Sequence, residues 1–233
     1  MSGTDPTRQA VTETAQPVFV LVRPQLGENI GAACRAMWNF GLDRLRLAAP
    51  RDGWPNPRAV AMASGASHVL DRATVHDDQA GALSDLEYVY ATTARTREMT
   101  KTVFTPAAAM ADALARIRAG QKVGVLFGPE RTGLESEEVA RAQAIISVPA
   151  NPVFASLNLA QCVLLTAYEW RRQATETPPE TLDPGKLGLA GRESVDRVIA
   201  RLEDELEGAN FFFPPEKGPT MRLNIRNLFS RAP

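Results

Sequence analysis

A short and almost uninterrupted apolar run occurs several times in this chain, each time separated from the next by a helical pattern. Val18–Val22 (VFVLV) and Val123–Phe127 (VGVLF) are the clearest examples. A strand that is apolar on both faces has to be covered on both faces, which is typical of parallel sheets whose strands are joined by helices. The alternation therefore predicts a layered α/β domain with a mostly parallel sheet.

Further strands and helices extend this pattern over residues 16–173. Gly41 follows the first predicted helix and suits the left-handed residue that ends many helices. The last predicted helix is apolar on nearly all sides, which predicts burial within its own domain or against a second subunit. The remaining strands are predicted at 45–47, 88–91 and 144–148, and the helices at about 28–40, 106–119 and 156–172.

The rest of the chain divides into an arm, a linker and an extension. Residues 1–15 lack apolar periodicity and predict a disordered arm. Residues 174–191 include two consecutive prolines and predict a linker. Residues 192–233 predict a small helical extension, with an amphipathic helix at 192–207 and a short one at about 220–229. The segment after residue 216 contains basic residues and no acid, so it is either a solvated helix face or a small surface for a polyanion.

The composition excludes several classes of protein. Of the 233 residues, 44% are hydrophobic and 23% are charged, and the net charge is −1, so any attraction to a polyanion must be local. No apolar run approaches the length of a membrane span, and the first residues show no secretory signal. We therefore expect a cytoplasmic protein without a membrane partner.

Metal and thiol chemistry are also not expected. The two cysteines, Cys34 and Cys162, lie in apolar helical patterns and are expected to be reduced thiols. His68 and His76 are the only histidines and are interpreted as structural or surface residues. Because no Cys-x-x-Cys pair is present, no metal site is predicted.

The loops that follow the strands are the candidate ligand sites, since parallel α/β sheets bind ligands beyond the carboxyl ends of their strands. In the first loop, Asn29 and Gly31 lie at a helix N-terminus and Arg35 follows on the same helix. Free backbone N–H groups and a guanidinium suit a phosphate or carboxylate. The alternative is an ordinary helix start with a surface arginine.

The second loop follows the strand Val123–Phe127 and contains Gly128 and Gly133. Its Gly-x-x-x-x-Gly spacing is that of a phosphate-binding loop, but Leu134 and Glu135 replace the Lys and Ser or Thr which that motif needs. A nucleoside triphosphate site is thus excluded. The loop, with its carboxylate Glu130, either surrounds a cationic or zwitterionic ligand or is a plain turn.

Two further segments contain small and polar residues. Ser156 and Asn158 precede a helix, where capping is the alternative to a ligand-binding role. In the segment 91–97, small residues would allow a flat ligand to approach and two arginines would suit phosphates. Taken alone, these residues predict an α/β protein with several ligand-sized loops and do not identify a reaction.

Three of these loops, in this order, resemble the sequence motifs of the SPOUT superfamily of RNA methyltransferases. The first motif is Asn29-x-Gly31-x-x-x-Arg35, the second is Phe127-Gly128-Pro129-Glu130-x-x-Gly133-Leu134, and the third is Ser156-Leu157-Asn158-Leu159-Ala160. The resemblance covers residues 17–172. Residues 151–161 and the segment 227–232 are most similar to the TrmJ branch, although Val153 and Ala155 stand where that branch commonly carries an acid and a serine.

The resemblance implies a fold, a co-substrate and a partner. It implies an α/β knot, in which a parallel sheet has helices on both faces and its C-terminal part forms a trefoil knot, and it implies a homodimer. It also implies that S-adenosylmethionine (SAM) is the co-substrate, without a metal. The implied cofactor-binding residues are Thr92, Thr93, Ala94, Gly128, Val148, Ala155, Ser156 and Leu157. The residues implied to face the reacting ribose are Asn29, Arg35, Glu130 and Asn158.

The implied activity is methylation of a ribose 2′-hydroxyl of RNA, most specifically at the pyrimidine in position 32 of the tRNA anticodon loop. A ribosomal RNA 2′-O-methyltransferase and a non-catalytic knotted RNA-binding protein are the alternatives. A guanidinium stays protonated in proteins, so we interpret Arg35 as a ligand of the RNA phosphate that also stabilises the developing alkoxide. The phosphate or Glu130 would then accept the proton. The expected RNA contacts are Arg35, Arg95, Arg97, Lys101, Arg222 and Arg226.

Overall fold

The computed structural model describes residues 15–94, 100–175 and 190–230. The chain divides into two compact units, residues 1–177 and 178–233. The boundary between them falls inside the predicted linker, most of which lies outside the described residues, as does nearly all of the predicted N-terminal arm.

The first unit contains a seven-stranded sheet in the order β3-β2-β1-β6-β4-β7-β5, and every recorded pairing is parallel. The prediction of a parallel α/β sheet is confirmed. Strand β1 pairs with β2 on one side and with β6 on the other. The strands that directly follow β1 in the chain therefore extend the sheet to one side, and the later strands extend it to the other. The strands are β1 Val18–Val22, β2 Leu45–Ala48, β3 Thr74–His76, β4 Tyr88–Thr92, β5 Thr102–Phe104, β6 Val123–Phe127 and β7 Ala144–Ile146.

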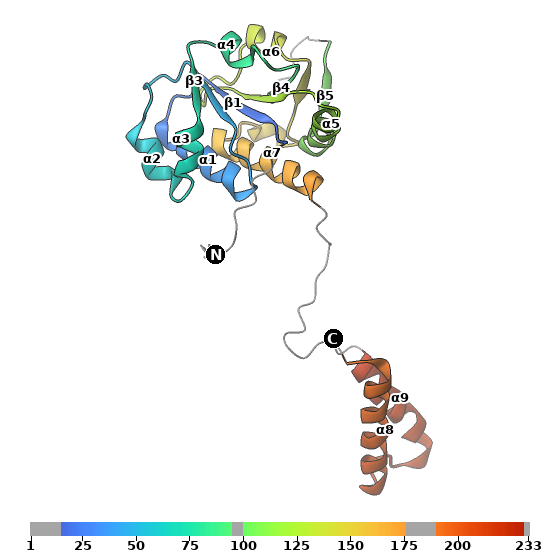
Figure 1. Cartoon of the computed structure of the whole chain (residues 1–233). Coiled ribbons are helices and arrows are strands. Elements are labelled where there is room, and N and C mark those ends of the chain that lie inside the picture. The colour runs from blue at the N-terminus through green and yellow to red at the C-terminus, as the bar shows by residue number, and fades with distance from the viewer. Residues whose placement is uncertain (1–14, 95–99, 176–189, 231–233) are drawn as a thin grey trace. The chain divides into compact units, whose positions relative to one another are not determined.

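Helices cover both faces of this sheet (Figure 1). The larger apolar core lies between one face and helices α1, α2, α3, α5 and α7, and the smaller core lies between the other face and α4 and α6. Strands β1 and β6 are buried along their whole length, as their uninterrupted apolar runs require. The helices are α1 Gly27–Asn39, α2 Pro57–Ala63, α3 Ser67–Arg72, α4 Gln79–Leu83, α5 Pro106–Arg118, α6 Ser136–Ala140 and α7 Leu159–Ala174.

The structure differs from the sequence prediction in its short elements. The sequence did not predict α2, α3, β3, α4, β5 or α6, each of which has at most seven residues and therefore shows no measurable periodicity. Helix α7 begins at Leu159 rather than at residue 156, and β7 ends at Ile146. Of the two alternatives predicted for α7, burial within its own domain is incomplete, because Leu164, Leu165 and Tyr168 are exposed. Burial against a second subunit stays a prediction.

The second unit is a pair of packed helices, α8 (Arg192–Gly208) and α9 (Gly218–Ser230), joined through the 3-10 helix Pro215–Lys217. Ile199 of α8 and Phe212 of the connection supply its buried apolar side chains. None of the helices in the described parts of the chain is long and apolar enough to cross a membrane.

Candidate active site

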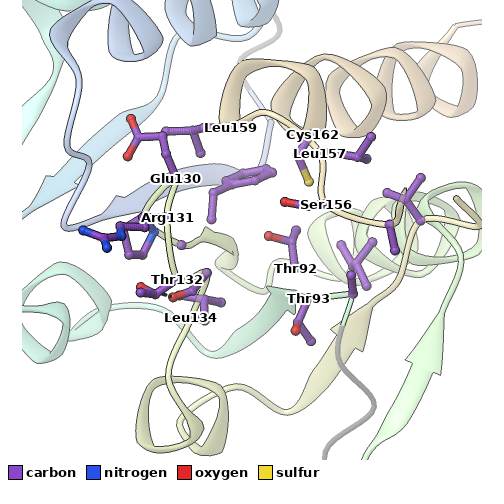
Figure 2. A pocket seen from close by; sticks show the side chains of 18 residues that line it. Thr92, Thr93, Glu130, Arg131, Thr132, Leu134, Ser156, Leu157, Leu159 and Cys162 are labelled. Atoms are coloured by element: carbon purple, nitrogen blue, oxygen red, sulfur yellow. Dashed lines mark hydrogen bonds between the residues drawn. The ribbon is translucent and has the colours of Figure 1, made fainter. Parts of the chain in front are cut away.

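The carboxyl ends of β4, β6 and β7 surround a cavity of about 330 Å³ that the start of α7 closes (Figure 2). All eight residues expected to bind the cofactor line this one cavity, although they come from four separate segments of the chain. The sequence did not predict a further set of lining residues, which only the folding of the loops brings to the wall: Phe127, Pro129, Arg131, Thr132, Gly133, Leu134, Ile146, Leu159 and Cys162.

The loop after β6 forms one wall by folding tightly back on itself. The N–H of Gly133 donates to the carbonyl of Pro129 at 2.8 Å, and Gly133 has a φ of 65°, which favours glycine. A Cβ on Gly128 would lie 2.2 Å from the backbone nitrogen of Leu134. The two glycines are therefore required by the shape of this turn. The Gly-x-x-x-x-Gly spacing results from this requirement and does not indicate a triphosphate-binding loop.

The interior of the cavity is apolar with small polar groups. Figure 2 shows Thr92, Ser156 and Cys162 turning their polar atoms toward a common space, whereas Glu130 and Arg131 turn their charged ends away from it. The Thr92 hydroxyl donates to the carbonyl of Leu126 at 2.8 Å, which fixes its position. Burial raises the pKa of the Cys162 thiol to about 11, so this thiol is neutral near pH 7. The cavity thus suits a ligand with substantial apolar surface.

Glu130 also lines the cavity, but its carboxylate turns away from the interior and binds the residues that precede α1. Its carboxylate accepts hydrogen bonds from the backbone N–H groups of Gln25 at 2.8 Å and Leu26 at 3.1 Å. It also accepts a hydrogen bond of 2.9 Å from the Asn29 side-chain amide. Three donors therefore hold this carboxylate in place, and its main role in this structure is to join the loop after β6 to the loop after β1.

Asn158 continues the same network from α7. Its Oδ1 accepts hydrogen bonds from the N–H groups of Ala160 and Gln161, so the residue is the N-cap of α7. Its Nδ2 donates to Oδ1 of Asn29 at 3.0 Å. The capping alternative for Asn158 is confirmed, and the remaining side-chain atom contacts Asn29. A role of Asn158 toward the ribose stays a prediction. Ser156 is not the cap.

Arg35 lies on α1 with an exposed side chain. Within the described residues no hydrogen bond or ion pair is recorded for it, so its guanidinium remains available to an anion brought by a substrate. The structure therefore combines a fixed polar network formed by Asn29, Glu130 and Asn158 with one exposed guanidinium on the same helix as Asn29.

The other predicted RNA contacts lie in different surroundings. Arg95 and Arg97 lie outside the described residues. The ammonium group of Lys101 donates to the backbone carbonyls of Ala140 and Ala142, at the end of α6. Lys101 is thus engaged within the protein, and its RNA contact stays a prediction.

Arg222 and Arg226 form ion pairs inside the second unit. Arg226 makes two hydrogen bonds of 2.8 and 2.9 Å to the carboxylate of Glu203, and Arg222 pairs with Glu207. The Arg222 guanidinium also stacks 4.0 Å above the ring of Phe212. The acid-free tail of the sequence is therefore neutralised in part by acids of α8, which the spacing along the chain did not reveal.

Comparison with known proteins gives consistent matches over most of the chain. A model of the SpoU rRNA Methylase family matches residues 16–168. The tRNA (cytidine/uridine/adenosine-2′-O-)-methyltransferase TrmJ of Pseudomonas aeruginosa (strain UCBPP-PA14) is 35% identical over 221 residues, which cover 91% of this chain and 85% of that protein.

Two solved structures are also similar. The crystal structure of TrmJ from Z. mobilis ZM4 has a TM-score of 0.79 at 50% identity and covers 93% of this chain and 91% of that one. A structure concerned with the 2-OH methylation of C/U34 on tRNA has a TM-score of 0.52 at 29% identity and covers 68% of this chain and 90% of that one. The fold of this chain is thus one that solved structures already show.

Proposed function

This chain belongs to the SpoU rRNA methylase family, and we propose that it transfers the methyl group of SAM to a ribose 2′-hydroxyl of tRNA. The observation that carries the proposal is the juxtaposition of a neutral cavity with the Asn29–Glu130–Asn158 network and the exposed Arg35. A relative at 35% identity that is named as a tRNA 2′-O-methyltransferase supports tRNA as the substrate.

The cavity fits a SAM molecule in both size and chemistry. Ligand pockets of this kind span about 300–1,000 Å³. Glycine is needed at position 128 because a Cβ there would collide with the backbone of Leu134. Thr92, Thr93, Ala94, Val148, Ala155, Ser156 and Leu157 would hold SAM together with Gly128. When bound, it supplies an electrophilic methyl group on a sulfonium. The apolar lining residues suit the adenosine part of this cofactor, and the small polar groups suit the ammonium and carboxylate of its methionine part.

The protein's own residues act on the RNA. In the transfer, the bond between the ribose oxygen and the methyl carbon forms as the carbon–sulfur bond breaks, and the 2′-hydroxyl loses its proton. Arg35 binds the adjacent phosphate and stabilises the developing negative charge on the ribose oxygen. Because three donors already occupy the Glu130 carboxylate, we assign the proton to a phosphate oxygen of the RNA, and Glu130 positions Asn29.

We also propose that the protein forms a homodimer, contains a trefoil knot and acts in the cytoplasm. Strand β7 is inserted between β4 and β5, and the chain after β7 leads directly into the cavity wall and α7, which is compatible with the family's trefoil knot. Three apolar side chains of α7, those of Leu164, Leu165 and Tyr168, are 37–48% exposed. A second copy of the chain would cover them.

We propose the pyrimidine at position 32 of the anticodon loop as the target nucleotide. The position is implied by the resemblance to the TrmJ branch, and the names of the relatives support a cytidine or uridine of tRNA. A second candidate is position 34, because the protein behind one similar structure acts on C/U34. Both candidates are nucleotides of a single-stranded loop, which a protein can splay out and bind more readily than nucleotides of a duplex. Ribosomal RNA is the remaining substrate class.

The test uses the full-length protein, labelled SAM and unmodified tRNA, followed by digestion and mass spectrometry of the nucleosides and fragments. A 2′-O-methylated nucleoside at position 32 is the expected product. Methylation at 34 would support the second candidate, and transfer only to ribosomal RNA would reject tRNA as the substrate. Binding of SAM without transfer to any RNA would indicate a non-catalytic RNA-binding protein.

A further inference from the structure

Arg23 connects the end of β1 to the first turn of α6. It follows the last residue of β1 and has a φ of 48°, an uncommon backbone conformation for a residue with a side chain. Its Nη2 lies 2.9 Å from a carboxylate oxygen of Glu135 and 3.0 Å from one of Glu138. The guanidinium therefore lies between two carboxylates that come from a segment more than 110 positions away.

These two carboxylates already form the capping box of α6. The Glu135 side chain accepts from the backbone N–H of Glu138, and the N–H of Glu135 donates to the Glu138 carboxylate at 2.7 Å. Two negative groups in one capping box repel each other, and Arg23 offsets that repulsion. Desolvation lowers the pKa of Arg23, but hydrogen bonds and Coulomb attraction from the two carboxylates outweigh it and raise this pKa.

The position of α6 determines where the cavity wall ends. The wall runs from Gly128 to Leu134 and leads directly into Glu135. Lys101 contacts the opposite end of α6 through the carbonyls of Ala140 and Ala142. Cations thus hold both ends of this five-residue helix, and the Arg23 contact is the one next to the wall.

We propose that Arg23 is a positioning residue for SAM binding, which acts by fixing the end of the loop 128–134 through Glu135 and Glu138. The inference rests on the proposed function and extends it to a residue outside the three motifs and outside the cavity lining. Its loss removes no cavity residue but allows the wall formed by residues 128–134 to move, so affinity for SAM decreases more than the rate of methyl transfer at saturating SAM.

The experiment measures SAM and S-adenosylhomocysteine binding by calorimetry, and kcat and KM for SAM, in Arg23→Met and Arg23→Lys. We expect about a tenfold rise in the SAM Kd and KM for Arg23→Met, which corresponds to about 1.4 kcal/mol. The kcat is expected to change by less than about threefold. Lysine keeps the charge but loses the planar fork, so Arg23→Lys should fall between the wild type and Arg23→Met.

Arg46→Met is the matched control. Arg46 pairs with Asp85 through two hydrogen bonds of 2.5 and 3.1 Å, and neither residue lines the cavity. Arg46→Met should lower the melting temperature without changing the affinity for SAM. Equal SAM affinity in Arg23→Met and wild type, or equal losses in both Met variants, would overturn the proposal.

A different result would reject the proposed function itself. If the wild-type protein itself binds neither SAM nor S-adenosylhomocysteine, the proposed function is wrong, and the role of Arg23 falls with it. Should Arg23→Met fail to fold, Glu138→Gln removes one partner of the same contact and must then show the rise in KM.

Discussion

The side-chain amide of Asn158 donates a hydrogen bond of 3.0 Å to Oδ1 of Asn29, although 129 positions separate the two residues. Asn29 in turn donates to Glu130 at 2.9 Å. One residue from each of three loops is thus joined in a single chain of hydrogen bonds at the carboxyl edge of the sheet. Such a network orients its members more firmly than separate contacts would.

Replacing Arg35 with alanine is expected to remove methyl transfer and retain SAM binding. The side chain is exposed on α1 and does not line the cavity, so its loss affects the RNA phosphate and the developing alkoxide. We expect kcat to fall by about a hundredfold or more, with a SAM Kd within about twofold of wild type. Arg118→Ala, an exposed arginine on α5, is the control. Full activity in Arg35→Ala would reject the assigned role.

Glu130→Gln separates a positioning role from a proton-accepting one. A glutamine offers one acceptor oxygen to three donors, so at least one backbone N–H of the α1 start loses its partner. We expect a loss of about 1–3 kcal/mol in the free energy of unfolding and lower kcat. The shape of the pH–rate profile should stay unchanged. Loss of its acidic limb would instead show that Glu130 accepts the proton. Glu137→Gln, at an exposed position of α6, is the control.

Two substitutions of Asn158 distinguish its cap from its contact with Asn29. Asn158→Asp keeps the acceptor oxygen that caps α7 and places negative charge at a helix N-terminus, so stability should be retained. It loses the donor to Asn29 and should reduce kcat at least tenfold. Asn158→Ala loses both and should also lose about 1 kcal/mol of stability. Thermal unfolding and methyl transfer are measured together. Activity retained in Asn158→Asp would show that the contact is dispensable.

Alkylation of Cys162 reports on the cavity. Because burial raises the pKa of this thiol to about 11 and the thiolate is the reactive form, labelling by iodoacetamide should be slow at pH 8 and accelerate as the pH approaches 11. Saturating SAM should slow it further. Peptide mapping separates this signal from Cys34, which is fully buried. Rapid labelling at pH 7, or no protection by SAM, would contradict the cavity assignment.

Substitutions in the second unit can test whether its arginines bind the phosphates of tRNA. We expect Arg222→Ala/Arg226→Ala to weaken tRNA binding and to lower its salt dependence by about two phosphate contacts. Glu203→Gln/Glu207→Gln keeps both cations and removes their acidic partners, so binding should equal or exceed that of wild type. Equal weakening in both double variants would show that these arginines serve only the packing of α8 against α9. Fluorescence titration over a salt series makes the comparison.

The regular elements were predicted from local apolar patterns, and the cavity residues were predicted from the resemblance to the family motifs. Long apolar runs such as Val18–Val22 indicate buried strands directly, and the motifs mark the loops that follow them. The short α6 gives no such signal, and Arg23 belongs to no motif. Its role depends on Glu135 and Glu138, which only the fold brings near. Lys101, Arg222 and Arg226 show the same limitation, because their partners come from distant segments.

By itself, the sequence determined the parallel sheet, the positions of its main strands along the chain and the loops that follow them, because these depend on local apolar patterns and glycine geometry. The order of the strands in the sheet came only from the tertiary structure. Tertiary structure alone decided which side chains meet. It brought Asn29, Glu130 and Asn158 into one network and left Arg35 exposed. It also engaged Lys101 with the end of α6. Burial and hydrogen bonding depend on distances between segments, and those distances exist only after the sheet has formed.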